Sequence, residues 1–251
     1  MKIRKNFAHA FTFFALLCLA NAFSVPLFAH SDEKENFSKQ QRELVVLASQ
    51  RNLNLNPHTS SFSIESQILN GLYEGLFTYN PVTLQSENAI CEGFKVSRDK
   101  KIWTFYIRDD AKFSDGKRIT ANDVKKSWVT MLKTPNAPFA SLLDIVSGVQ
   151  EFRLSPSDKK DEGKIGITVK DEKTLVVRLT SNADYLPSIL CHPSFSVIND
   201  NKLVFSGPFT LSNKTKDSIV LKKNPHYWDA DNVRLPSIRF IIRSEEHTSE
   251  L

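Results

Sequence analysis

The stretch Ile102–Val124, IWTFYIRDDAKFSDGKRITANDV, decides the fold of this chain. Its first six residues are aromatic or β-branched and place aromatic rings on both faces, which predicts a strand covered on both sides. Ser114-Asp115-Gly116 has the composition of a tight turn. Thr120 followed by Asp123 is an acidic variant of the capping box, which predicts the start of a helix. We therefore expect a strand, a turn and a helix in this order.

Apolar residues at helical spacing extend this pattern in both directions. The helix that begins at Thr120 has one apolar side, formed by Val124, Trp128, Met131 and Leu132. An upstream helix that ends at Tyr79-Asn80-Pro81 is predicted from Ile64, Ile68, Leu72 and Leu76. Further helical segments are expected at 137–152 and 185–190, and strands at 43–49, 165–169, 175–179, 209–211, 219–221 and 238–242. Because strands and helices mix without a regular βαβ order, the fold class is α/β in its mixed α+β form.

The composition is that of an ordinary globular protein. Among 251 residues, 41% are hydrophobic and 24% are charged, which excludes a disordered tail, a collagen-like fibre and a coiled coil. Glycine-rich phosphate-binding motifs and the G-x-S-x-G motif of hydrolases do not occur in the sequence. The net charge of +5 is spread along the chain, and Lys125-Lys126 and Lys222-Lys223 are isolated pairs without aromatic neighbours. We therefore expect no nucleic-acid partner.

The beginning of the chain has the pattern of an export signal. The basic start KIRK at residues 2–5 precedes the apolar run Phe11–Ala20, which is too short to span a bilayer. Ala20-Asn21-Ala22 supplies a small-x-small cleavage pattern, and Leu27-Phe28-Ala29 is a second candidate for the cleavage site. We expect a signal peptide over residues 1–22, or to residue 29, and a mature protein in the periplasm or cell envelope. Cys18 keeps a membrane-anchored lipoprotein as the alternative.

Residues that could carry chemistry are few and scattered. In an oxidising compartment Cys91 and Cys191 could form a disulfide or remain two buried free thiols. His58, His192 and His226 share no metal-ligand spacing, and no C-x-x-C motif occurs. No nucleophile–base–carboxylate set is apparent either. We therefore expect no enzyme activity, no metal and no cofactor.

The last nine residues, Arg243–Leu251 (RSEEHTSEL), break the pattern before them, since a strand-like segment turns abruptly polar. The run resembles the translation of a common sequencing adaptor. We expect residues 243–251 to be a non-native tail and the natural protein to continue beyond residue 242.

The order of segments resembles bacterial extracellular solute-binding protein family 5, the peptide/nickel-binding family, and especially its periplasmic oligopeptide-binding proteins. The motifs that carry the resemblance are Leu55-Asn56-Pro57-His58, Leu72-Tyr73-Glu74-Gly75-Leu76, Trp103–Arg108, Ala111–Gly116, Ile119–Val124, Ser206-Gly207-Pro208-Phe209 and Lys223-Asn224-Pro225-His226-Tyr227-Trp228. Each motif also has an explanation as scaffold, in turns, caps and buried aromatic residues. The motifs therefore identify the family better than they identify contacts with a ligand.

The resemblance implies a two-lobed fold like that of type II periplasmic binding proteins, with the second lobe largely missing. Residues 30–74 and 198–242 would form parts of lobe I, and residues 75–197 the small accessory domain typical of peptide-binding members. The protein would be a monomeric substrate-binding component of an ABC-type importer that captures extended oligopeptides and delivers them to an inner-membrane permease.

The resemblance also implies where the peptide binds. In relatives the peptide pairs through main-chain hydrogen bonds as an added strand, and the equivalent segment here is Ser61, Phe62 and Ser63. Relatives have a carboxylate near Ser61, and this sequence does not. Phe62 could form a pocket wall or belong to the core.

Other functions remain open at this point. A dipeptide, nickel or haem binder would share the same scaffold, and the segments 137–141 and 192–194 favour peptide over nickel. An exported hydrolase would need a catalytic set that the sequence does not display. A secreted adhesion protein would need an exposed basic or aromatic patch.

Overall fold

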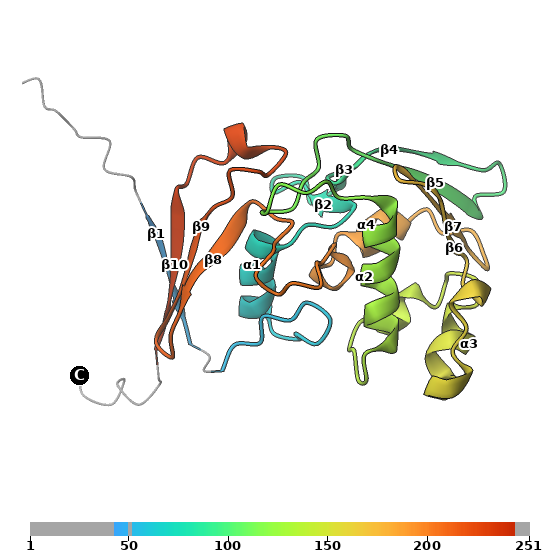
Figure 1. Ribbon diagram of the computed structural model, residues 1–251, viewed down its shortest axis with the longest axis horizontal. Coiled ribbons are helices and arrows are strands. Elements are labelled where there is room, and N and C mark those ends of the chain that lie inside the picture. Colours follow the sequence, from blue (N-terminus) through green and yellow to red (C-terminus); the bar gives the residue numbers. More distant parts are fainter. Residues whose placement is uncertain (1–42, 50–51, 244–251) are drawn as a thin grey trace, which may run out of the picture. The chain divides into compact units, whose positions relative to one another are not determined.

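The computed structural model describes residues 43–49 and 52–243, which all belong to a single compact unit (Figure 1). The expected signal peptide, Cys18 and the tail beyond Arg243 lie outside the described residues. Two four-stranded sheets and a two-stranded hairpin form the framework of this unit. Within the described residues, no helix combines the length and the apolar character that a membrane span requires.

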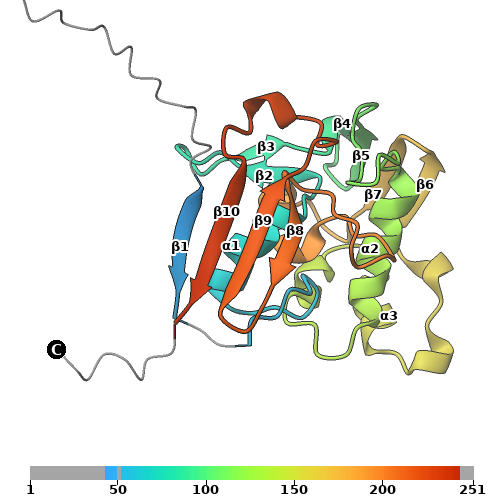
Figure 2. The same cartoon turned by 60° about the vertical axis from the view of Figure 1, so that its left-hand side comes forward.

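The first sheet joins the two ends of the described chain, and Figure 2 shows its four strands side by side. Its order is β1 (Leu44–Ala48), β10 (Ser237–Ile242), β9 (Ser218–Lys223) and β8 (Phe209–Lys214). β1 runs parallel to β10, and the other neighbours are antiparallel. Helix α1 (Ser63–Leu72) packs against this sheet and buries Ile68, Leu69 and Leu72 in a shared core.

The second sheet is antiparallel throughout and carries the larger core. Its order is β4 (Cys91–Val96), β5 (Ile102–Ile107), β7 (Thr174–Arg178) and β6 (Ile167–Asp171). Helix α2 (Ala121–Lys133) packs against β6 and β7, and α3 (Val149–Leu154) contacts α2. The hairpin of β2 (Phe77–Tyr79) and β3 (Ser86–Asn88) lies against α4 (Leu186–Leu190). Short 3-10 turns occupy residues 140–143, 157–159, 162–164, 193–195 and 230–232.

Most sequence predictions of secondary structure are confirmed. A strand overlaps each predicted strand, with bounds that differ by at most three residues, and the predicted pair 165–169 and 175–179 is the β6–β7 ladder. The apolar side predicted for α2 is buried: Val124, Trp128, Met131 and Leu132. The short helix predicted at 185–190 is α4.

Three predictions are wrong. The helix predicted to run to residue 79 ends at Leu72, because the Leu72 carbonyl accepts from the Gly207 N–H and the chain turns extended at Tyr73. Residues 137–152 are not one helix, because Gly148 adopts φ 74°, which lies outside the right-handed helical region. The position requires glycine, since an added Cβ would collide with the Lys164 carbonyl oxygen.

The third wrong prediction concerns β5, which is not covered on both sides. Its side chains alternate, so that Trp103, Phe105 and Ile107 are buried, whereas on the opposite face Thr104 and Tyr106 are half-buried and Ile102 is exposed. On that opposite face, Lys95 lies over the Tyr106 ring at 5.7 Å. The strand therefore has one core face and one face towards solvent, as antiparallel sheets often do.

The predicted capping box at the start of α2 is confirmed. The Thr120 hydroxyl donates to Asp123 Oδ2 at 2.6 Å, and the Asp123 N–H donates back to Thr120 Oγ1 at 3.4 Å. The Thr120 N–H also donates to the Asp123 carboxylate at 2.8 Å. Orphan donors of the first turn are thus satisfied locally.

Thr120→Ala should lower the free energy of unfolding by about 1 kcal/mol, because it removes the side-chain part of this cap. Thr130→Ala is a matched control, since Thr130 is exposed on the same helix and its hydroxyl bonds only the Lys126 carbonyl. We expect the control to change stability by less than about 0.5 kcal/mol. Urea unfolding followed by circular dichroism measures both, and equal losses would contradict the capping role.

Candidate ligand-binding site

The predicted peptide-pairing segment lies at the N-terminus of α1. Ser61, Phe62 and Ser63 are all exposed, and 54% of Phe62 is accessible to solvent. Phe62 is the N-cap residue with extended backbone (φ −102°, ψ 145°), and Ser63 is the first helical residue. Of the two alternatives for Phe62, the core residue is therefore wrong.

The buried carboxylate of Glu65 organises the backbone of this segment. It accepts hydrogen bonds from the N–H groups of Ser61 at 3.2 Å, Phe62 at 3.3 Å and Asn54 at 2.7 Å. The Phe62 carbonyl is also engaged, because it accepts from the Ser66 N–H. No acceptor for the Ser63 N–H and no donor to the Ser61 carbonyl is found within the described part of the chain. These two groups are therefore the ones that could pair with another strand.

The turn before the segment is built from asparagine side chains. Asn54 Oδ1 accepts from the Asn56 N–H, and Asn56 Oδ1 accepts from the His58 N–H, both at 3.0 Å. The Asn56 carbonyl accepts from the Thr59 and Ser60 N–H groups. Such side-chain turns fix a loop without an element of regular structure. Segment 55–60 is thus a fixed support for the exposed residues that follow.

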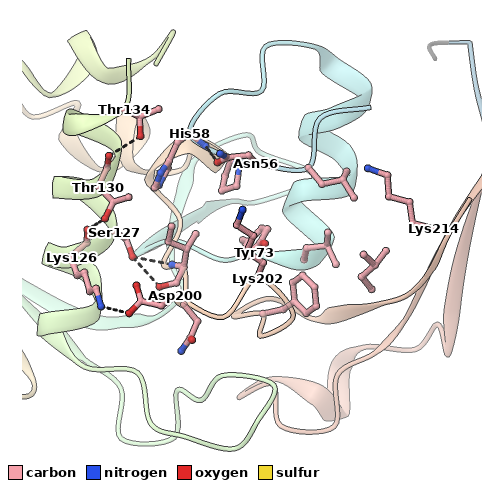
Figure 3. A pocket seen from close by; sticks show the side chains of 17 residues that line it. Asn56, His58, Tyr73, Lys126, Ser127, Thr130, Thr134, Asp200, Lys202 and Lys214 are labelled. Carbon is pink, nitrogen blue, oxygen red and sulfur yellow. Dashed lines mark hydrogen bonds and ion pairs between the residues drawn. The ribbon is translucent and has the colours of Figure 1, made fainter. Parts of the chain in front are cut away.

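A groove of about 470 Å³ lies between the loop 55–58, helix α2, residues 198–205 and strand β8 (Figure 3). The described groove does not include Ser61, Phe62 or Ser63 among its lining residues. Ser127 on α2 closes one wall, since its hydroxyl donates to the Asp123 carbonyl at 2.7 Å and accepts from the Ile198 N–H at 2.9 Å. The structure therefore separates the predicted peptide-pairing segment from this concave surface.

His58 lies at the wall of the groove beside α2. Only 2% of the residue is exposed, and burial lowers the pKa of its imidazole to about 4. Its Nε2 atom is buried without a hydrogen-bond partner among the described residues. The side chain is accordingly neutral at physiological pH and adds no charge to the groove.

A second polar centre lies where the two cores meet, at Glu74. Its carboxyl group accepts from the Tyr227 hydroxyl and, at 2.6 Å, from the Trp228 indole N–H. Its backbone N–H donates to the Ser206 hydroxyl at 3.0 Å, and its carbonyl accepts from the Val197 N–H at 2.8 Å. We call Glu74, Tyr227 and Trp228 the Glu74 junction.

Two further contacts fix the junction. The Arg108 guanidinium, just beyond β5, lies 3.7 Å from the centre of the Trp228 ring, a cation–π contact. Gly207 packs directly on the end of α1, where an added Cβ would lie 2.7 Å from the Tyr73 nitrogen. No larger residue fits there without displacing backbone. The family motifs around Glu74, Gly207 and Trp228 therefore act as scaffold.

Burial raises the pKa of the Glu74 carboxyl to about 7, although the bonds from Tyr227 and Trp228 oppose that shift. The Tyr227 pKa is raised as well, mainly by burial and then by the neighbouring Glu74 charge. Glu74 thus keeps its proton well above the ordinary range of a glutamate.

The described residues contain neither a disulfide nor a cluster of metal-binding side chains. Cys91 and Cys191 are free, buried thiols whose Sγ atoms donate to the Gly93 and Pro187 carbonyls. Burial raises the pKa of the Cys91 thiol to about 11 and that of Cys191 to about 12, so both are protonated and weakly reactive. Of the two alternatives for the cysteines, the structure has the free thiols. Residues 43–49 and 52–243 contain no cluster of three metal-binding side chains.

The segment Ser61–Ser63 was predicted from the family resemblance alone, and the sequence assigned no role to Glu65, to Tyr73 or to the groove. Glu65 occupies the third helical position, where a glutamate commonly bonds the capping backbone, and this spacing from Phe62 was the available signal. Tyr73 stands in the family motif Leu72–Leu76, but no local pattern indicates that it lines a groove, because part of the wall, including Phe205 and Leu211, comes from a distant part of the sequence.

Glu74→Gln should flatten the pH dependence of stability between pH 4.5 and 7. The folded pKa of about 7 lies above the ordinary value of 4.5, so the folded state retains a proton that the unfolded state releases. The resulting stability is complete below pH 4.5 and is lost as pH rises to 7, by at most about 3 kcal/mol. Urea unfolding at several pH values measures it, with exposed Glu92→Gln as the control. Parallel pH profiles for wild type and Glu74→Gln would refute the assignment.

Comparisons with known proteins agree on one family. The family model of bacterial extracellular solute-binding proteins, family 5 Middle, matches residues 85–250. The dipeptide-binding protein DppE of Bacillus subtilis is 30% identical over 94% of this chain and 45% of its own length. The periplasmic oligopeptide-binding protein OppA of Salmonella typhimurium is 30% identical over 77% of this chain and 38% of its own length.

The fold agrees as well. The structure of Haemophilus influenzae OppA in complex with the peptide RPPGFSPFR superposes with a TM-score of 0.74 and 27% identity, over 81% of this chain and 42% of that one. The chain thus spans less than half the length of these relatives. Its mixed α/β fold is that of the periplasmic oligopeptide-binding proteins, and the chain belongs to the bacterial extracellular solute-binding proteins of family 5.

Proposed function

We propose that this protein is the substrate-binding component of an ABC-type peptide importer, which captures extended oligopeptides by main-chain hydrogen bonds and delivers them to a membrane permease. The observation that carries the proposal is the exposed segment Ser61–Ser63, which presents an unused N–H and an unused carbonyl at a fixed backbone. Backbone pairing recognises a peptide whatever its side chains are. The relatives named as dipeptide- and oligopeptide-binding proteins support the ligand class.

The arrangement of the cores supports the proposed division into domains. One hydrophobic cluster draws its buried residues from 53–73 and 205–240, and the other from 76–204. We assign the first to lobe I, formed by residues 30–74 and 198–242, and the second to the accessory domain 75–197. The change from the second cluster to the first at Phe205 supports a return to lobe I close to the proposed boundary at residue 198.

The first sheet supports a longer functional protein. β1 lies at its edge, and Leu44, Val45 and Leu47 are between 44% and 60% exposed. Apolar edge strands are usually covered in native proteins. We propose that further chain, comparable to the unmatched part of the relatives, covers this edge and supplies the second lobe, and that the whole protein works as a monomer in the cell envelope.

Ser63→Pro should weaken peptide binding without harming the fold. Proline lacks the N–H and is well tolerated at the first helical position, and the extended Phe62 before it suits a following proline. Losing one main-chain hydrogen bond should raise Kd for tri- to pentapeptides about three- to tenfold in the full-length protein. Isothermal titration calorimetry measures Kd.

Ser63→Ala is the matched control, because it removes the side chain but keeps the N–H. Equal Kd values for the two variants would contradict main-chain pairing at Ser63. The proposed ligand class would be contradicted if the full-length protein bound Ni²⁺ or haem but no peptide in the same titrations.

A further inference from the structure

The groove between α2 and β8 has the size and walls of a small-molecule site that peptide pairing does not use. Its volume of about 470 Å³ falls within the range of ligand pockets. The apolar side chains of its wall include Leu55, Leu72, Phe205 and Leu211. Because loop 55–58 and β8 belong to one core and α2 to the other, the groove is a feature of their junction.

The Tyr73 hydroxyl is an unused hydrogen-bonding group in this groove. Only 9% of Tyr73 is exposed, and its ring packs on Phe205 with centroids 5.5 Å apart. Within the described residues its hydroxyl has no hydrogen-bond partner, and Figure 3 shows the side chain among those that surround the groove. Burial raises the pKa of the hydroxyl to about 12, so it remains a donor at neutral pH.

The charges around the groove favour an anion. Three lysines line it, Lys126, Lys202 and Lys214, against the single carboxylate of Asp200. Lys126 pairs with Asp200, and Lys214 donates to the Leu53 carbonyl at 3.2 Å. Neither Lys202 nor Lys214 forms an ion pair with any described residue. With His58 neutral, the groove therefore has a positive rim around an apolar floor.

We propose that this groove binds a small amphipathic carboxylate, with its apolar part against Leu55, Phe205 and Leu211 and its carboxylate at the Tyr73 hydroxyl and the lysine rim. A cationic amphiphile would be repelled by the positive charges of the lysine rim, and a neutral amphiphile would form no ion pair with these lysines. A peptide backbone is not required, so this site is independent of the proposed function.

Sodium decanoate, below its micelle concentration, is a suitable probe. In isothermal titration calorimetry with the protein it should bind with one site per chain, whereas decyltrimethylammonium should not bind. Tyr73→Phe keeps the ring packing and removes the donor, and Lys202→Gln removes an unpaired charge. Each should raise Kd for decanoate about tenfold, as expected for one hydrogen bond or contact to a charged group.

Lys222→Gln is the matched control, because Lys222 is exposed on β9 and does not line the groove. It should leave Kd unchanged. The proposal is overturned if decanoate gives no binding heat, if decyltrimethylammonium binds equally well, or if Tyr73→Phe and Lys202→Gln bind like Lys222→Gln. Titrations of the same variants with peptides test the proposed peptide binding separately. The peptide-binding proposal and the carboxylate proposal can therefore fail independently of each other.

Discussion

The arrangement of the two cores depends on the hydrogen bonds that the buried carboxyl group of Glu74 accepts. A carboxyl removed from water is costly unless donors meet it, and here the Tyr227 hydroxyl and the Trp228 indole converge on its two oxygens. The backbone of the same residue bonds Ser206 and Val197. One residue thus joins the end of α1, the loop after β9 and the segment that returns from the second core.

The remaining geometry follows from this junction. Arg108 stacks on Trp228 and so connects the second sheet to the loop after β9 of the first. Gly207 brings the returning chain against the end of α1, which places Tyr73 and Phe205 side by side. The groove between α2 and β8 has walls from both cores, so its width is set by how the junction holds them. Site geometry is therefore a property of packing between segments far apart in sequence.

Sequence patterns predicted those helices and strands that are determined by interactions between residues close together in the sequence. The Thr120–Asp123 cap and the β-branched runs of β1, β7 and β10 are complete signals within a few residues. The predictions failed where distant backbone intervened, as at Leu76, which keeps the helical spacing of α1 but lies beyond the end that Gly207 imposes. The Ser61–Ser63 segment came from family resemblance and not from its own residues. Glu65 had a local signal in its spacing from Phe62, whereas the groove around Tyr73 is assembled from distant segments and could not be assigned from spacing.

The parallel pairing of β1 with β10 has a consequence for the order in which the chain folds. All strands of the second sheet lie within residues 91–178, so that core can form while synthesis or export is still in progress. The β8–β9 pair of the first sheet does not need β10, but β1 cannot join this sheet until residues 237–242 emerge, since β10 separates β1 from the other two strands. Closing so long a loop is slow. The first strand in the described chain thus pairs only after the last strand has emerged, and until then its backbone N–H and C=O groups have no partner strand.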